Sequence, residues 1–98
     1  MPILPETSKR DRMRVKFAEA DFEIGFSLVD MAEAETIRFN YDRASRILED
    51  ADRVFLDIQQ ILRRLTVSDR GPFGPLLREL DRAIGLAKLN ITSRHGAG

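Results

Sequence analysis

The chain has 98 residues, of which 43% are hydrophobic and 33% are charged, a composition typical of one globular helical domain and too apolar for a disordered chain. Sixteen basic and sixteen acidic side chains cancel, which excludes a global field that would attract nucleic acid or an anionic membrane. The absence of cysteine excludes disulfides, thiolate catalysis and the usual zinc sites. Residues 1–8 lack a signal-peptide core and no uncharged run is long enough to cross a bilayer, so we expect a soluble, cytoplasmic protein without a membrane partner.

The N-terminal region is predicted to be an extended arm followed by a long helix. Residues 1–7 contain two prolines and form the arm, and Thr7 or Ser8 can cap the helix by accepting a hydrogen bond from its free backbone N–H groups. The first helix is predicted over residues 8–38, within a stretch that has no proline and a single glycine, Gly25.

Two apolar stripes follow different faces of this predicted helix. At about 100° per residue they lie nearly opposite each other, so the helix needs two partners. Packing against both of the other helices is one interpretation, and contact with a further chain is the other. We predict that the second stripe is the candidate interface. The first stripe consists of Met13, Phe17, Ala20, Ile24, Leu28 and Met31, and the second stripe consists of Val15, Phe22, Phe26 and Val29.

A turn is predicted at residues 36–41. If one helix were extrapolated through this region, the next apolar stripe would fall on almost the opposite side, and Asn40 is a suitable N-cap residue. The second helix is therefore predicted over residues 41–65, with its polar side chains on one face. Its apolar stripe consists of Ala44, Ile47, Ala51, Val54, Ile58, Ile61 and Leu65.

The strongest helix breaker in the chain is the glycine- and proline-containing stretch over residues 66–74, which is predicted to be a loop. A third helix is predicted over residues 75–92, because Pro75 suits a first helical position and apolar residues recur at helical spacing after it. Residues 93–98 are predicted to form a flexible tail.

These elements predict an all-α fold with a single domain over residues 1–98. The simplest architecture is a three-helix up-down-up bundle, made of a long antiparallel helical hairpin plus a third helix and open to completion by dimerisation. The loop over residues 66–74 is also a hinge that would allow the third helix to swap into a neighbouring chain, although packing within one chain is the default.

Residues around the first turn follow a regular spacing. They are Ala32, Ala44, Leu48 and Ala51. Over residues 28–51 this spacing resembles the tetratricopeptide helical hairpin and is similar to the helix pairs of MIT-type three-helix domains. The chain departs from the tetratricopeptide pattern at Glu35, where an aromatic residue is expected, and at Leu56, where a closing proline is expected. The resemblance implies binding of a peptide or partner helix in a groove and no catalysis.

Few residues point to chemistry. The single histidine, His95, lies in the predicted tail, where we expect a solvated side chain and not a catalyst. Carboxylates at helical spacing, Glu19 with Glu23 and Asp30 with Glu33, lack the Glu-x-x-His motif of di-iron bundles and are interpreted as solvated faces. We therefore predict no catalytic residue, no metal ligand and no cofactor, and we expect that the protein is not an enzyme.

A basic cluster marks the start of the first helix. Positive charge at this position opposes the helix dipole, so the cluster does not serve to stabilise the helix. A phosphate-contacting patch is one explanation, and a solvated first turn that pairs with an acidic partner is the favoured one. The cluster consists of Lys9, Arg10, Arg12, Arg14 and Lys16.

The leading hypothesis is a non-catalytic α-helical module for protein–protein interaction or oligomerisation, forming a homodimer or another homo-oligomer or binding the helix of another protein. The first alternative is a nucleic-acid-associated protein that uses the basic cluster, although the neutral net charge disfavours nucleic acid as a partner. The second alternative is an accessory subunit of an operon-encoded complex.

Overall fold

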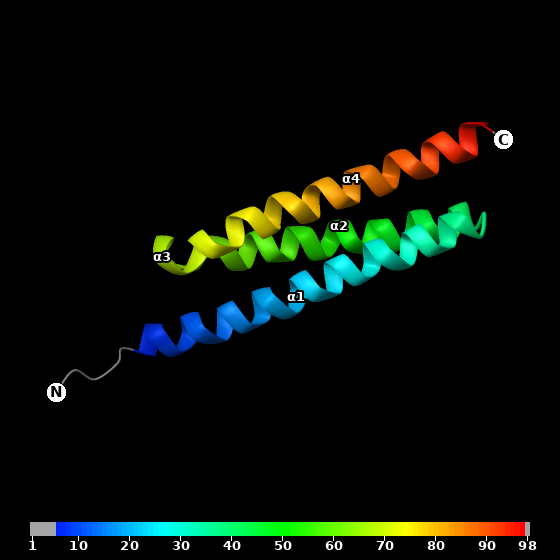
Figure 1. Ribbon diagram of the computed structural model, residues 1–98. Helices are drawn as coiled ribbons and strands as arrows, with labels where there is room; N and C mark the ends of the chain where they lie inside the picture. Colours follow the sequence, from blue (N-terminus) through cyan, green and yellow to red (C-terminus); the bar gives the residue numbers. More distant parts are fainter. Residues whose placement is uncertain (1–5, 98) are drawn as a thin grey trace.

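Three long helices lie side by side in an up-down-up arrangement, which confirms the predicted all-α bundle (Figure 1). The computed structural model describes residues 6–97, with side chains described over residues 9–95. The long helices are α1 (Glu6–Ile37), α2 (Tyr41–Arg63) and α4 (Gly74–Ala97); between α2 and α4 lie the one-turn helix α3 (Val67–Arg70) and the 3₁₀ helix η1 (Gly71–Phe73). The molecule is a rod with extents of 67 × 18 × 15 Å.

The helices extend further than the sequence pattern indicated. α1 begins at Glu6, so Thr7 and Ser8 lie inside the helix instead of capping it, and residues 1–5 of the predicted arm lie outside the described residues. At the other end, α4 continues to Ala97 through most of the predicted tail. Side-chain contacts support this last stretch, because Arg94 Nε donates to the Asn90 side-chain oxygen at 3.2 Å, one helical turn earlier.

The predicted loop over residues 66–74 is mostly helical. Thr66 caps α3, because its side-chain oxygen accepts a hydrogen bond from the Asp69 amide at 3.1 Å. Pro72 lies in the first turn of η1 and Pro75 in the first turn of α4. A first-turn residue has no intrahelical partner for its N–H, so a proline there removes no hydrogen bond. The glycines and prolines of this stretch therefore do not prevent two short helical turns from forming between α2 and α4.

The turn between α1 and α2 is a Schellman motif. The amide of Asn40 donates to the carbonyl of Glu35 at 2.9 Å, and the amide of Phe39 donates to the carbonyl of Thr36 at 3.0 Å. Phe39 has φ 67°, a left-handed conformation that costs an L residue about 1–2 kcal/mol. Asn40 occupies the N-cap position of α2, yet its side chain makes no cap hydrogen bond and instead donates to Glu35 Oε2 at 2.7 Å.

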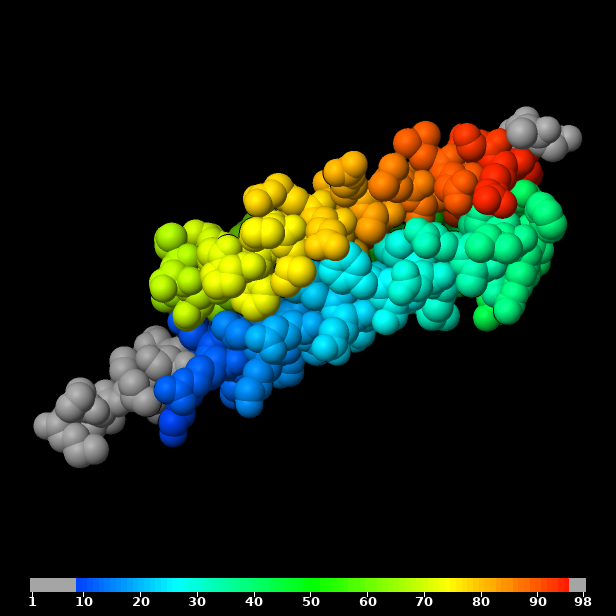
Figure 2. All heavy atoms as spheres, viewed as in Figure 1, coloured from blue at the N-terminus to red at the C-terminus, as the bar shows by residue number. Residues whose placement is uncertain are grey.

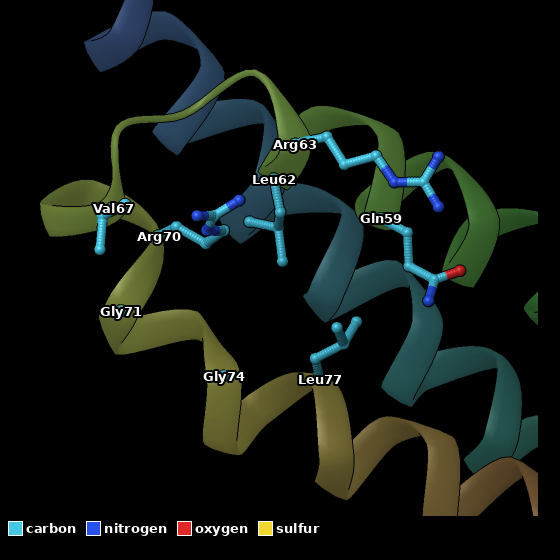
Figure 3. A pocket seen from close by; sticks show the side chains of 8 residues that line it. All are labelled: Gln59, Leu62, Arg63, Val67, Arg70, Gly71, Gly74 and Leu77. Atoms are coloured by element: carbon cyan, nitrogen blue, oxygen red, sulfur yellow. The ribbon is translucent and has the colours of Figure 1, made fainter.

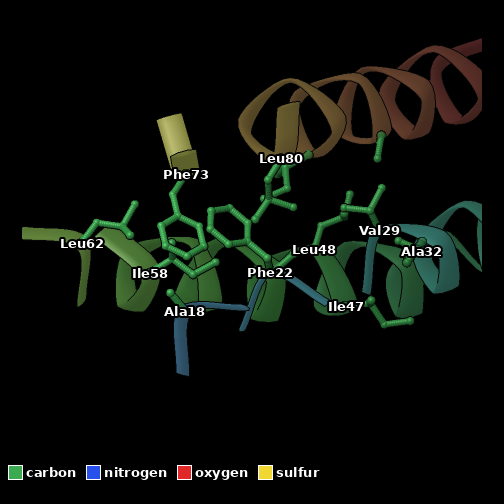
Figure 4. Packing of buried hydrophobic residues seen from close by; sticks show 14 of the residues in the cluster. Ala18, Phe22, Val29, Ala32, Ile47, Leu48, Ile58, Leu62, Phe73 and Leu80 are labelled. Carbon is green, nitrogen blue, oxygen red and sulfur yellow. The ribbon is translucent and has the colours of Figure 1, made fainter. Parts of the chain in front are cut away.

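The core runs along the whole bundle (Figure 4). α1 and α2 are the most closely packed pair of helices, and small residues line their contact. On α1 these are Ala18 and Ala32, and on α2 they are Ala44 and Ala51. Gly25, seven residues from each of the two α1 alanines, faces both Leu80 of α4 and Val54 of α2. Small side chains let two helix backbones approach closely, so this spacing selects the face of α1 that α2 covers.

α4 closes the bundle over this hairpin. Its buried side chains are Leu80, Ile84, Ala87 and Ile91. The four residues that carry the tetratricopeptide-like spacing are also buried, where α1 and α2 meet: Ala32, Ala44, Leu48 and Ala51.

Candidate protein-interaction surface

The second stripe of α1, which was predicted to form an interface, packs inside the chain. Phe22 and Val29 are buried, and Val15 and Phe26 are half-buried against the core. Phe22 also stacks on Phe73, with ring centroids 5.7 Å apart (Figure 4). The second stripe is therefore occupied by the chain's own helices, which corrects its assignment as an open interface. The reason is that this stripe lies beside the small residues along which α2 approaches α1.

Most of the first stripe remains exposed, as do other large apolar side chains, among them Leu86 and Leu89 of α4. Met13, Phe17, Ile24 and Met31 are each between 48% and 57% exposed, and Ala20 lies exposed among them. α1 runs along one edge of the rod (Figure 2). Leu28, the remaining member of the stripe, is half-buried against the core. At 1.5 Å per residue, the stripe is about 27 Å long. Four large apolar side chains in one row form a contiguous patch of the kind that marks an interaction site.

The basic cluster is divided by the structure. Lys9, Arg10, Arg12 and Lys16 are exposed, but Arg14 turns towards the bundle. Arg14 Nη1 lies 3.1 Å from Asp11 Oδ1 and donates to the carbonyl oxygen of Arg64 at 3.3 Å. A cation at this position stabilises the C-terminal end of α2, where carbonyl groups have no helical partner. Arg14 therefore ties α1 to α2, which the sequence pattern did not indicate.

A groove between α1 and α4 flanks the first stripe. It has a volume of about 610 Å³ and is lined by Phe22, Phe26 and Leu76 together with Glu19, Glu23 and Ser27. Phe22 and Phe26 of the second stripe both line this groove, and Phe26 is the more exposed of the two. Glu23 and Ser27 separate the apolar part of this groove from the first stripe.

A second hollow lies where α2, α3 and α4 meet, with a volume of about 410 Å³. Leu62, Val67 and Leu77 provide its apolar lining. Arg70 reaches towards Leu62, whereas Arg63 extends away along α2 (Figure 3). This hollow holds no acid–base pair.

Partial burial, and secondly the negative charge of Asp57, raise the pKa of the Asp21 carboxyl above its ordinary value of 3.8. His95 is exposed, as the sequence pattern predicts, and its ring also stacks on Tyr41 of α2, with ring centroids 4.9 Å apart. Over the part of the chain that the structure describes, no three His, Asp or Glu side chains converge to hold a metal ion.

None of the described helices has the length and apolar character needed to cross a bilayer. Comparison with protein-family models, with curated proteins and with solved structures finds no match for this chain.

Proposed function

We propose that this protein is a non-catalytic helical interaction module that self-associates, and that the first stripe of α1 is its contact surface. The observation that carries the proposal is the row of half-exposed side chains Met13, Phe17, Ile24 and Met31 on the outer face of α1. Removing apolar surface from water contributes roughly 25 cal/mol per Å², so a second helix laid along this row would stabilise the assembly.

The size of the stripe sets the strength that we expect. A surface about 27 Å long and about 10 Å wide covers roughly 300 Å² on each copy. Two copies would therefore bury roughly 600 Å² of stripe, and the charged side chains along its flanks would raise the total towards the lower end of specific interfaces, about 1,200 Å². Such an interface supports a reversible dimer with a dissociation constant in the micromolar range.

The test is the solution mass of three proteins, measured by light scattering over a range of concentrations. The variant Ile24→Glu places a charge in the middle of the stripe. The control Leu56→Glu places the same charge on an exposed leucine of α2, which lies outside the stripe and is similarly exposed. We expect the mass of the wild type and of Leu56→Glu to rise towards that of a dimer, while Ile24→Glu stays monomeric with unchanged helical circular dichroism.

Two outcomes would overturn the proposal. One is a wild type that stays monomeric up to millimolar concentration. The other is an Ile24→Glu variant that associates as strongly as Leu56→Glu, because the contact would then lie elsewhere on the molecule.

A further inference from the structure

We propose that two copies of this chain pair through the first stripe of α1 in antiparallel orientation, so that the basic start of each α1 lies beside the acidic part of the other. The inference rests on the self-association proposed above, and it adds the orientation and the register of the pair. It also assigns a partner to Arg12 and Lys16 of the basic cluster, namely the acidic half of a second α1.

Charge is segregated along α1. Residues 9–16 contain five basic side chains and one acidic side chain, whereas residues 17–37 contain six acidic side chains and no basic one. In a parallel pair, like charges would lie beside each other along the whole helix. An antiparallel pair instead brings opposite charges together at both ends. The segregation therefore favours the antiparallel orientation and disfavours the parallel one.

Six of these charges lie on one flank of the first stripe. At about 100° per residue they all lie between the stripe and the side of α1 that faces α4: Lys9, Arg12, Lys16, Glu19, Glu23 and Asp30. All six are exposed, and none has a hydrogen bond or ion pair with another described residue. A two-fold axis that reverses the helix direction keeps each flank on its own side, so this flank meets the same flank of the second copy.

Aligning the two stripes end to end defines the register. Met13 then lies beside Met31 of the second copy, and Ala20 lies beside its Ile24. Each large side chain at the centre of the interface therefore faces a small one, as in the interlocking packing of helix pairs.

The same register places the flanking charges. Arg12 lies beside Asp30 of the second copy, and Lys16 lies between its Glu23 and its Asp30. The like charges Glu19 and Glu23 approach those of the second copy near the two-fold axis, which keeps the association reversible.

Orientation is tested by cysteine cross-linking, for which the chain is suited because it contains no cysteine. The variants Met13→Cys and Met31→Cys are purified separately, one with a mass tag, and oxidised alone and as a mixture. Positions 13 and 31 lie about 27 Å apart along α1, whereas a disulfide needs Cα atoms within about 7 Å. We expect a disulfide-linked pair in the mixture and almost none in either variant alone.

Each other outcome is decisive. A disulfide in each variant alone, with no disulfide between a tagged and an untagged chain in the mixture, means a parallel pair, which overturns the antiparallel orientation and leaves self-association standing. Equal yields in all three samples mean a contact without defined register, which also overturns the inference. Samples that light scattering shows to be monomeric overturn both proposals.

Charge reversal tests the same inference without cross-linking. In an antiparallel pair, the double variant Arg12→Glu/Lys16→Glu places acidic side chains beside the acidic side chains of the second copy. We expect its dissociation constant to rise at least tenfold at low salt. Adding Glu23→Lys and Asp30→Lys returns the net charge to that of the wild type and restores opposite charges across the interface. We expect this quadruple variant to associate at least as strongly as the wild type.

A parallel pair responds differently, because its two-fold axis runs along the helices and sets this flank against the opposite flank of the second copy, where Arg10 lies. The new glutamates would then face a basic residue, so the association would not weaken. An unchanged dissociation constant in the double variant, or no recovery in the quadruple variant, therefore overturns the charge-matched orientation. Both effects should shrink at 1 M salt, where the Debye length is about 3 Å.

Discussion

Replacing Gly25 with alanine measures how tightly α4 closes over the α1–α2 hairpin. Gly25 lies in the middle of α1, where its backbone faces Leu80 of α4 and Val54 of α2. A Cβ atom at this position would lie 2.9 Å from Leu80 Cδ2, 3.3 Å from Leu80 Cδ1 and 3.6 Å from Val54 Cγ1. Leu80 is completely buried, so its side chain can move away only into a core that is already filled.

Two contributions of opposite sign determine the result. Alanine in place of a glycine in a helix interior stabilises the helix by about 1 kcal/mol. Crowding a packed core with an extra methyl group costs about 1–3 kcal/mol. We therefore expect Gly25→Ala to leave the free energy of unfolding unchanged or to lower it by up to about 2 kcal/mol.

Gly85 provides the matched control. It also lies inside a long helix, α4, and a Cβ atom there would meet nothing within 4 Å. Gly85→Ala should therefore show the full helix gain of about 1 kcal/mol, which raises Tm by about 4–8 °C in a domain of this size.

The assay is thermal and urea unfolding followed by circular dichroism, with all three proteins at one low concentration so that self-association contributes equally. We expect Gly85→Ala to be more stable than the wild type, and Gly25→Ala to be as stable as the wild type or less stable. A Gly25→Ala protein that matched Gly85→Ala would refute the reasoning, because Leu80 would then not press α4 against α1 at this point.

Two further changes probe single residues by urea unfolding. Phe39→Gly should raise the free energy of unfolding by up to about 1 kcal/mol, because glycine adopts the left-handed conformation of residue 39 without strain. The substitution also removes the edge contact of Phe39 with Tyr41, whose ring centroids lie 6.3 Å apart. A loss of stability would mean that this contact outweighs the backbone strain. Asp21→Asn tests the raised pKa of Asp21. Because the carboxyl is harder to ionise in the folded protein than in the unfolded chain, the protein loses stability as the pH rises from 3.8 through the folded-state pKa. We expect Asp21→Asn to be more stable than the wild type at pH 7 and equal to it at pH 3. The gain at pH 7 should be less than about 1 kcal/mol, because solvent screens the partly exposed pair of Asp21 and Asp57. A gain in stability that persisted at pH 3 would have another cause.

The sequence pattern predicts the positions of the helices better than it predicts which apolar surface of the protein stays exposed. The out-of-phase apolar stripes predict a turn near Asn40, and α1 ends at Ile37 while α2 begins at Tyr41. The boundaries of α4 were harder to predict, because the contacts that support its last turns come from its own side chains and from Tyr41 of α2. Phe73 was also missed as a core residue, since a breaker-rich segment gives no sign that an aromatic ring within it stacks on Phe22.

The candidate surface was assigned to the opposite face of α1. Both stripes of α1 are apolar, and hydrophobicity alone does not say which of them the chain itself will cover. A signal was present in the sequence, because Ala18, Gly25 and Ala32 recur every seven residues beside the second stripe. Small residues at that interval mark the face on which another helix approaches closely, so this spacing predicts core better than the size of the apolar side chains does.

By itself, the sequence determined that the chain forms amphipathic helices, where its first hairpin turns, and that charge is segregated along the first helix, since these follow from local patterns of residue type. Only the tertiary structure decided which stripe of α1 is buried, that Arg14 binds the end of α2, and that Met13, Phe17, Ile24 and Met31 remain open. The physical reason is that burial depends on how closely three helices can approach one another. That distance is set by contacts between residues far apart in the chain.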